Sequence, residues 1–374
     1  MKITIFGLTI SSSWGNGHAT PYRAIVRALA RRGHQVTFFE KDVEYYYWRR
    51  DFAQLDYCKL VLYSSWEDLR RKALAETSES CAVIVGSYCP DGARIADEVL
   101  ALDGPLHIFY DLDTPITLAN MQHGDLDYLR RDQVGAFDLY LSFTGGDILR
   151  ELEGRWGARM ARALYGCVDP EVHARVAMLE KYRCDLSYMG TYATDRQHKV
   201  EELFVRPARL MQTASFVLAG SLYPRGWVWP SNVKRFDHVA PGAHPALYSS
   251  SRATLNVTRD GMARGGYCPS GRFFEAAACG TTIITDWFEG LDTFFHPEEE
   301  LIVVSHAEQV KAALEMTDAE LHRVALRAKE RTLTEHTGDA RAEELSRYME
   351  EARRGESVAS AEASSRTSSL EVAS

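Results

Sequence analysis

The chain has 374 residues, of which 45% are hydrophobic and 25% charged, and its formal net charge is −9. The length favours two domains over a single core, and the negative charge makes nucleic acid a poor candidate partner. No apolar run reaches the 18 residues that suggest a membrane span, and seven scattered cysteines without a C-x-x-C pair indicate reduced thiols in a cytoplasmic protein.

The first half of the chain alternates short apolar runs with helical stretches. Helices are expected near residues 21–32, 66–77 and 91–102, and the predicted strands are KITIFGL, QVTFFE, CAVIVGS, PLHIFYD and FDLYLSF. Such alternation is typical of a parallel sheet with helices on both faces. We therefore predict an α/β domain at residues 1–168.

The alternation restarts after LYGCVDPEVH with DLSYMGT, SFVLAGS, ATLNVTR, TTIITDW and ELIVVS. This restart predicts a second α/β domain at residues 169–337, and VDPEVH is a plausible linker because Pro170 breaks regular structure. Two helical stretches follow, at about 318–334 and 338–354. Residues 355–374 contain almost no large apolar groups, so we expect a disordered tail there.

A phosphate-binding helix start is predicted in CPSGRFFEAAACG at residues 268–280. Ser270 can cap a helix that Gly280 ends, and free N–H groups at such a start bind phosphate. Arg272 and Glu275 are spaced i, i+3, so Arg272 could meet phosphate oxygens while Glu275 accepts from sugar hydroxyls. The alternative is an ion pair between these two residues. Arg259, at the end of NVTR, could supplement the site or be a surface cation.

The loop TISSSWGNGHATPYR follows the first predicted strand and leads into a helix with Thr20 as cap and Pro21 as first residue. Ligands bind at this position in doubly wound sheets. His18 could be a general base, or it could simply hydrogen-bond the loop. The expected acceptor loop consists of Trp14, Gly15, Asn16, Gly17 and Tyr22. The aromatic run YYYW at 45–48 could line the same site, but core or rim positions are favoured for most of it.

The segment HIFYDLDTP ends a buried strand with Asp111 and Asp113. Alternate residues of a strand point in opposite directions, so at most one of the two carboxylates should face the ligand. A D-x-D pair can hold a metal ion, but we favour a contact between one of these carboxylates and a substrate here. The remaining alternative is a turn in which either Asp hydrogen-bonds the backbone.

Three segments resemble the CgeB-like glycosyltransferases, a branch of the GT-B superfamily similar to the glycosyl transferases of group 1. They are SSSWGNGHATPYRAIVRALARRGHQVTFFEKD, FYDLDTP and NVTRDGMARGGYCPSGRFFEAAACGTTIITDWFEGLDTFF. The resemblance implies two Rossmann-like domains facing across a cleft, with the acceptor on the first, the donor nucleotide on the second, and helix 338–354 crossing back. It also implies that the turn from Ser270 through Gly271 to Glu275 holds diphosphate and ribose, without a metal.

One departure from the wider retaining group is Tyr267, which stands where many members carry a Glu. The loop TDWFEGLDTFF offers Asp286 and Glu289, which could read the hydroxyls of the donor sugar in its place. A solvated loop is the competing interpretation.

The predicted function is transfer of a sugar from a UDP-, GDP- or TDP-sugar to a hydroxyl of a small-molecule, glycan or protein acceptor. His18 and Asp113, or Asp111, would position the acceptor, while the helix start and Arg272 stabilise the leaving diphosphate. A nicotinamide-dependent oxidoreductase is an alternative, since Glu40 ends the second strand as in dinucleotide sites, although the loop lacks G-x-G-x-x-G. A GT-B epimerase or hydrolase, or a binding protein without turnover, are further alternatives.

Overall fold

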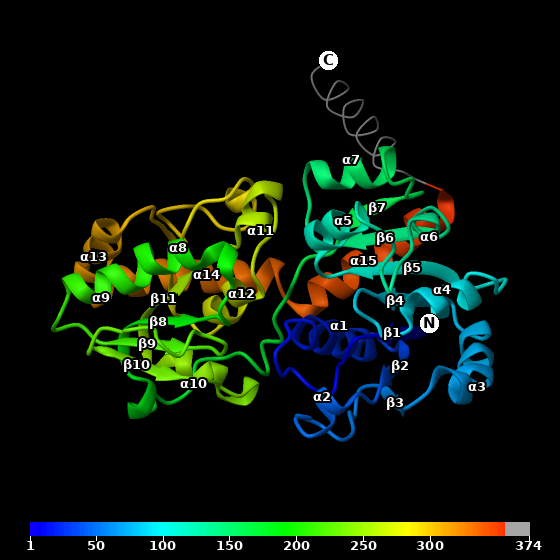
Figure 1. Ribbon diagram of the computed structural model, residues 1–374, viewed down its shortest axis with the longest axis horizontal. Coiled ribbons are helices and arrows are strands. Elements are labelled where there is room, and N and C mark those ends of the chain that lie inside the picture. Colours follow the sequence, from blue (N-terminus) through cyan, green and yellow to red (C-terminus); the bar gives the residue numbers. More distant parts are fainter. Residues whose placement is uncertain (356–374) are drawn as a thin grey trace, which may run out of the picture. The chain divides into compact units, whose positions relative to one another are not determined.

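Two parallel β-sheets, one in each of two units, organise the chain (Figure 1). The computed structural model describes residues 1–355. Unit 1 comprises Met1–Tyr165 and the residues from Gly338 on, and unit 2 comprises Gly166–Thr337. The tail predicted at 355–374 lies outside the described residues, apart from Gly355. Within residues 1–355 no helix has the length and apolar character needed to cross a membrane.

The sheet of unit 1 has the order β3-β2-β1-β4-β5-β6-β7. Its strands are β1 (Lys2–Gly7), β2 (Gln35–Lys41), β3 (Lys59–Tyr63), β4 (Ala82–Gly86), β5 (Leu106–Asp111), β6 (Leu139–Ser142) and β7 (Ala161–Ala163). The helices are α1 (Ala19–Arg31), α2 (Glu44–Tyr47), α3 (Trp66–Ser78), α4 (Gly92–Val99), α5 (Thr114–Met121), α6 (Arg131–Val134), α7 (Asp147–Gly154) and α15 (Gly338–Arg354).

The sheet of unit 2 has the order β10-β9-β8-β11-β12-β13. Its strands are β8 (Cys184–Met189), β9 (Phe216–Ala219), β10 (Val233–Phe236), β11 (Ser251–Asn256), β12 (Thr282–Thr285) and β13 (Ile302–Val303). The helices are α8 (Gln197–Val200), α9 (Arg206–Leu210), α10 (His244–Ser249), α11 (Asp260–Gly265), α12 (Gly271–Ala278), α13 (Ala307–Glu315) and α14 (Asp318–Glu335).

Both sheets are wholly parallel and share one winding pattern. In each, the first strand of the unit lies between the second and the fourth, so β1 pairs with β2 and β4, and β8 pairs with β9 and β11. The chain therefore reverses its direction of winding beside β1 and beside β8. In such sheets ligands bind at the carboxyl ends of the strands at this reversal. The predicted pair of Rossmann-like sheets is confirmed.

The edge strands β3, β7 and β10 are not predicted by the sequence pattern. β3 (KLVLY) and β10 (VKRF) have exposed positions that interrupt the apolar run, and β7 has only three residues. Central strands such as β4 (AVIVG) are buried at every position, since helices cover parallel sheets on both faces.

The last described helix, α15, returns to unit 1, in agreement with the expected C-terminal helix that crosses back (Figure 1). It packs against α1, where the backbone of Gly338 lies so close to Ala24 that a Cβ would stand 2.4 Å from its carbonyl oxygen. Arg31 bonds Asp339 at 2.8 Å, and Leu345 is buried. The terminal helix is therefore part of the core of unit 1.

Candidate functional site

The start of α12 lies at the predicted ligand edge of unit 2. Ser270 is the N-cap, and its Oγ accepts a hydrogen bond from the backbone N–H of Arg272 at 3.4 Å. The helix ends before Gly280, whose φ of +69° closes the turn without steric cost. Both predictions, the cap and the end, are confirmed. Gly271 opens the helix with no neighbour within 4 Å of the position of a Cβ, so the surface there is open.

Three arginines gather near this helix start. The side chain of Arg196 is buried, and its Nε has no hydrogen-bond partner. Its burial lowers the pKa of Arg196, and the positive charges of Arg272 and Arg259 act in the same direction. The one ion pair that residues 1–355 provide for them joins Arg259 to Asp195 at 3.0 Å. The excess of positive charge beside the N-terminus of a helix suits a phosphate-bearing ligand.

Sequence reasoning missed Arg196. It follows β8, the first strand of unit 2, and a cation placed just after such a strand stands at the ligand edge. The motif G-T-Y-A-T-D-R could therefore have indicated it.

Glu275 lies in a buried cluster with three aromatic side chains. Its Oε2 is 3.3 Å from Nδ1 of His244, 4.0 Å from Nε2 of His173 and 3.5 Å from the hydroxyl of Tyr248. Burial on its own raises the pKa of Glu275, but the close approach of His244 and the charges of His173, His244 and Arg272 outweigh it and lower the pKa to about 2. No ion pair joins Arg272 to Glu275 within the described chain, so the intrahelical alternative is not formed.

The same cluster is the one group of side chains in residues 1–355 that could hold a metal ion. The ligand atoms of His173, His244 and Glu275 lie within 4.8 Å of one another. Two imidazoles and a carboxylate are a ligand set that suits zinc.

The loop after β12 places its two acidic side chains differently. Asp286 is buried, and its oxygens already accept from the backbone N–H of Thr258 at 2.9 Å and from Lys199 at 3.0 Å. Glu289 is exposed, and its carbonyl oxygen accepts from the N–H of Tyr267 at 2.6 Å, which ties it to the turn before α12. Glu289 is therefore the better candidate for a sugar contact.

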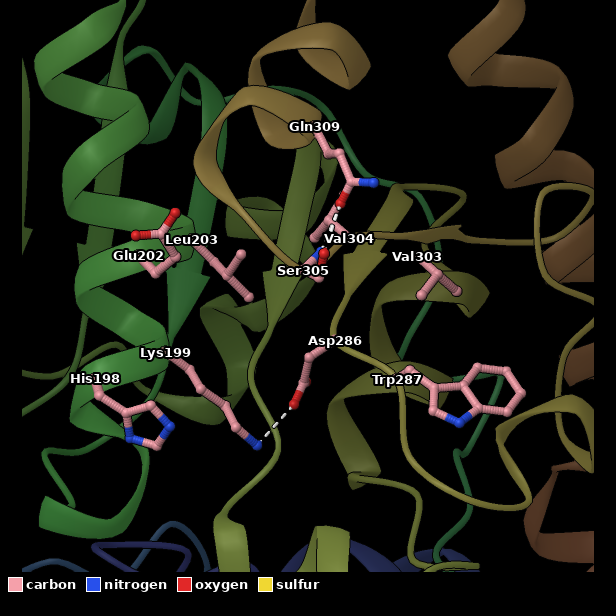
Figure 2. A pocket seen from close by; sticks show the side chains of 10 residues that line it. All are labelled: His198, Lys199, Glu202, Leu203, Asp286, Trp287, Val303, Val304, Ser305 and Gln309. Carbon is pink, nitrogen blue, oxygen red and sulfur yellow. Dashed lines mark hydrogen bonds and ion pairs between the residues drawn. The ribbon is translucent and has the colours of Figure 1, made fainter.

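A cavity of about 450 Å³ adjoins Asp286 on the side of β13. Figure 2 shows Lys199 of α8 and Asp286 pointing toward each other at its wall, with Trp287 at one side. Lys199 also pairs with Asp260 at 3.2 Å, so its charge is already balanced by two carboxylates. The cavity shares only Asp286 with the predicted donor residues and offers no surplus charge for a phosphate.

In unit 1 the loop after β1 is held by Glu40. The buried Glu40 carboxylate accepts from the backbone N–H groups of Ile10 and Ser11 at 2.8 and 3.0 Å, and from the Ser11 hydroxyl at 2.6 Å. A carboxylate that binds ribose in a dinucleotide site must be free for the ligand. The loop itself takes up Glu40, which counts against the oxidoreductase alternative.

Helix α1 begins earlier than predicted. Its first residue is Ala19, not Pro21, and the capping acceptor is Oδ1 of Asn16 instead of Thr20. Asn16 accepts from the N–H groups of His18 and Ala19 at 3.0 and 3.2 Å. Because this side chain already satisfies the first free donors, the helix starts two residues sooner. Gly17, in the same loop, has open space around its Cα.

His18 and Asp113 are brought together at this edge, and Asp111 is not. Nε2 of His18 lies 3.9 Å from Oδ2 of Asp113, and Nδ1 of His18 has no hydrogen-bond partner. Asp111 is fully buried and accepts from Tyr140, Thr117 and the N–H of Asp113. Of the two predicted carboxylates, Asp113 is the one that accompanies His18.

The aromatic residues of unit 1 do not lie where the sequence suggests. Tyr22, expected in the acceptor loop, is 2% exposed and packs on Tyr110 and Phe38. In the run YYYW, three of the four side chains are exposed and only Tyr46 is buried, so a core position is wrong for most of it, whereas exposed positions are compatible with a rim. The exposed members are Tyr45, Tyr47 and Trp48.

This exposed run adjoins the predicted acceptor loop. Tyr45 packs over Gly15, where a Cβ would stand 2.5 Å from the Tyr45 hydroxyl, and the Arg49 guanidinium lies 4.3 Å above the Trp14 ring. Aromatic surface therefore continues from the loop to the run.

Residues 196–347 match a family model described as glycosyl transferase-like. Over these residues the chain is similar to glycosyl transferases. The matched segment includes the start of α12, the arginines around it and Glu275. No curated protein sequence matches the chain.

Solved glycosyltransferase structures share the fold. An alpha-glucosyltransferase (AGT) in complex with UDP aligns at a TM-score of 0.70 with 14% identity, over 93% of this chain and 99% of that one. Sucrose-phosphate synthase from Thermosynechococcus elongatus aligns at 0.64 with 13% identity, over 95% and 100%. Anabaena HepE in complex with UDP and glucose aligns at 0.63 with 10% identity, over 94% and 99%. The predicted GT-B fold is confirmed, and the family match over residues 196–347 agrees with the predicted glycosyltransferase class.

Proposed function

We propose that unit 2 binds a nucleotide-diphosphate sugar and unit 1 binds an acceptor hydroxyl, and that the protein transfers the sugar without a metal ion, as a member of the CgeB-like branch. The observation that carries this proposal is the cluster of Arg196, Arg259 and Arg272 at the capped start of α12. UDP is the first nucleotide to test, because the similar AGT and HepE structures contain it.

The cluster supplies what departure of a diphosphate requires. Charge develops on the diphosphate as its bond to the sugar breaks, and preorganised donors aimed at that charge lower the barrier. The positive N-terminal end of α12 and the guanidinium of Arg272 can stabilise that charge. Glu275 would read the ribose, and Glu289 the donor sugar.

On unit 1 the pair of His18 and Asp113 is our candidate for activating the acceptor. In the proposed step the acceptor oxygen bonds to the anomeric carbon, while the bond from that carbon to the diphosphate oxygen breaks and its electron pair leaves with the diphosphate. The acceptor proton passes to Nε2 of His18, and Asp113, 3.9 Å away, stabilises the imidazolium that forms.

The acceptor would lie along Trp14, Tyr45 and Trp48. Exposed aromatic faces suit sugar rings and other flat apolar groups, so a glycan, a small molecule and a glycan-bearing protein all fit. None of the seven cysteines, all within residues 1–355, forms a disulfide, which supports a reaction in the reducing cytoplasm.

A metal held by the D-x-D pair has little support in unit 1. Three donors already occupy the carboxylate of Asp111, so only Asp113 could serve as a ligand. We therefore expect transfer to continue in EDTA.

The donor site is tested by calorimetric titration with UDP, GDP, TDP and NAD. We expect at least one nucleoside diphosphate to bind, and Arg272→Gln to weaken that binding about 10- to 100-fold, since hydrogen bonds to charged groups contribute about 1.5–3 kcal/mol. Arg327→Gln is the matched control, because Arg327 is an exposed arginine on α14. Binding of NAD alone, or equal affinities for the two variants, would refute the donor site.

A further inference from the structure

All the polar contacts of the Glu275 carboxylate approach one of its two oxygens. His244, Tyr248 and His173 each come closest to Oε2. No hydrogen bond within residues 1–355 reaches Oε1. The side chain is 8% exposed, so neighbouring groups and not water determine its orientation. The carboxylate is held from one side, and one oxygen is left over for a ligand.

The ring of His244 is itself anchored at its far end. Its Nε2 lies 3.2 Å from the carbonyl oxygen of Val239, which can only accept, so Nε2 carries a hydrogen. Nδ1 faces Glu275 at 3.3 Å, and a carboxylate also only accepts. The ring therefore spans Val239 and Glu275, with Nε2 at the carbonyl oxygen and Nδ1 at the carboxylate.

We propose that His244 is a positioning residue for donor recognition: by pairing with Oε2 it turns Oε1 of Glu275 toward the ribose hydroxyls of the nucleotide. This inference rests on the proposed function. When the ligand lacks the ribose hydroxyls, a buried carboxylate oxygen that should accept from them is left without a hydrogen bond. A site of this kind therefore binds the deoxy ligand much more weakly. His244 therefore acts on the preference for ribose more than on affinity for the diphosphate.

His173 contributes less to the orientation. Its Nε2 is 4.0 Å from Oε2, beyond hydrogen-bond distance, and its burial lowers its pKa, which favours the neutral ring. Its side chain is buried and belongs to the same cluster.

The test compares UDP with 2′,3′-dideoxy-UDP by calorimetric titration of the full chain. For the native protein we expect UDP to bind about 10- to 100-fold more tightly, the range of a hydrogen bond to a charged group. Two variants of similar polarity distinguish the role of Nδ1 from that of Nε2. His244→Asn keeps an amide N–H near Nδ1, toward Glu275, and His244→Gln keeps one near Nε2, toward Val239. The preference is the ratio of the affinity for UDP to the affinity for 2′,3′-dideoxy-UDP. We expect this ratio to stay within about threefold of the native value in the Asn variant and to fall at least about fivefold in the Gln variant.

Affinity for 2′,3′-dideoxy-UDP should change less than about twofold in both variants, which a general loss of structure would not allow. His322→Asn, at an exposed histidine of α14, is the control. Equal preferences in the Asn and Gln variants would overturn the positioning role. So would loss of the native preference in EDTA, which would assign His173, His244 and Glu275 to a metal. Failure of the native protein to bind either ligand would instead count against the proposed function.

Discussion

Asp111 and Asp113 are two residues apart at the end of β5, yet their environments are opposite. Asp113 is one-third exposed beside His18, whereas Asp111 is enclosed by Tyr140 and Thr117. Burial raises the pKa of Asp111 to about 6, although its three hydrogen-bond donors act in the opposite direction. The strand pattern predicts that only one of them faces the ligand, but the choice depends on Tyr140 of β6, which no local pattern places there.

This environment predicts an unusual dependence of stability on pH. The pKa of Asp111 in the folded state, about 6, lies above the value of about 3.9 in an unfolded chain. Between these pH values the folded state binds more protons than the unfolded state. The contribution of Asp111 to the free energy of unfolding therefore falls as pH rises from about 4 to about 6, and it is constant above that.

Asp111→Asn removes the charge and keeps the shape, and the Tyr140 hydroxyl can accept from the new amide. Relative to the native protein, we expect the free energy of unfolding of the variant to rise by about 2–3 kcal/mol between pH 4 and pH 7. Urea unfolding at a series of pH values measures this difference. Asp237→Asn, at an exposed carboxylate, should give a curve parallel to the native one, and a parallel curve for Asp111→Asn would contradict the prediction.

At the scale of elements, α12 depends on the turn before it and on the loop after β12. Gly290 has a φ of +83°, and a Cβ there would stand 2.4 Å from the ring of Tyr267. Tyr267 itself has a φ of +45°, a strained conformation for a residue with a side chain. At the position where many members of the wider retaining group carry a Glu, the ring of Tyr267 packs the turn before α12 against the loop after β12.

Gly290→Ala should strain both segments. We expect a loss of about 1–3 kcal/mol in the free energy of unfolding, from the left-handed backbone and the clash together. Gly242→Ala is the matched control, since nothing lies within 4 Å of its added Cβ and its φ is not left-handed. Equal unfolding midpoints for the two variants in urea would show that the loop adapts freely.

At the scale of the whole molecule, the chain leaves unit 1 at Tyr165, builds unit 2, and returns with α15. The return is stabilised by apolar burial of Leu345 and Met349 and by the pairs Arg31–Asp339 and Arg162–Glu351. Unit 1 is therefore incomplete until the last helix is made.

Leu345→Ala tests this dependence. Leu345 is 1% exposed, so we expect the cavity to cost about 2–5 kcal/mol in the free energy of unfolding. Leu326→Ala, at a leucine of α14 that is 49% exposed, should change it by less than about 0.5 kcal/mol. Denaturant unfolding of both variants measures these changes. Similar unfolding midpoints would mean that α15 adds little to the stability of unit 1.

Local sequence alone determined the two parallel sheets, the cap at Ser270, the end at Gly280 and the terminal helix, because apolar periodicity and capping chemistry act within a few residues. It indicated, for the same reason, the helix start that we propose binds phosphate. Only the tertiary structure decided that Arg196 joins Arg259 and Arg272, that Asp113 accompanies His18, and that His244 faces Glu275. These contacts join residues from different elements, and a side chain's partners there depend on which strands and helices pack together.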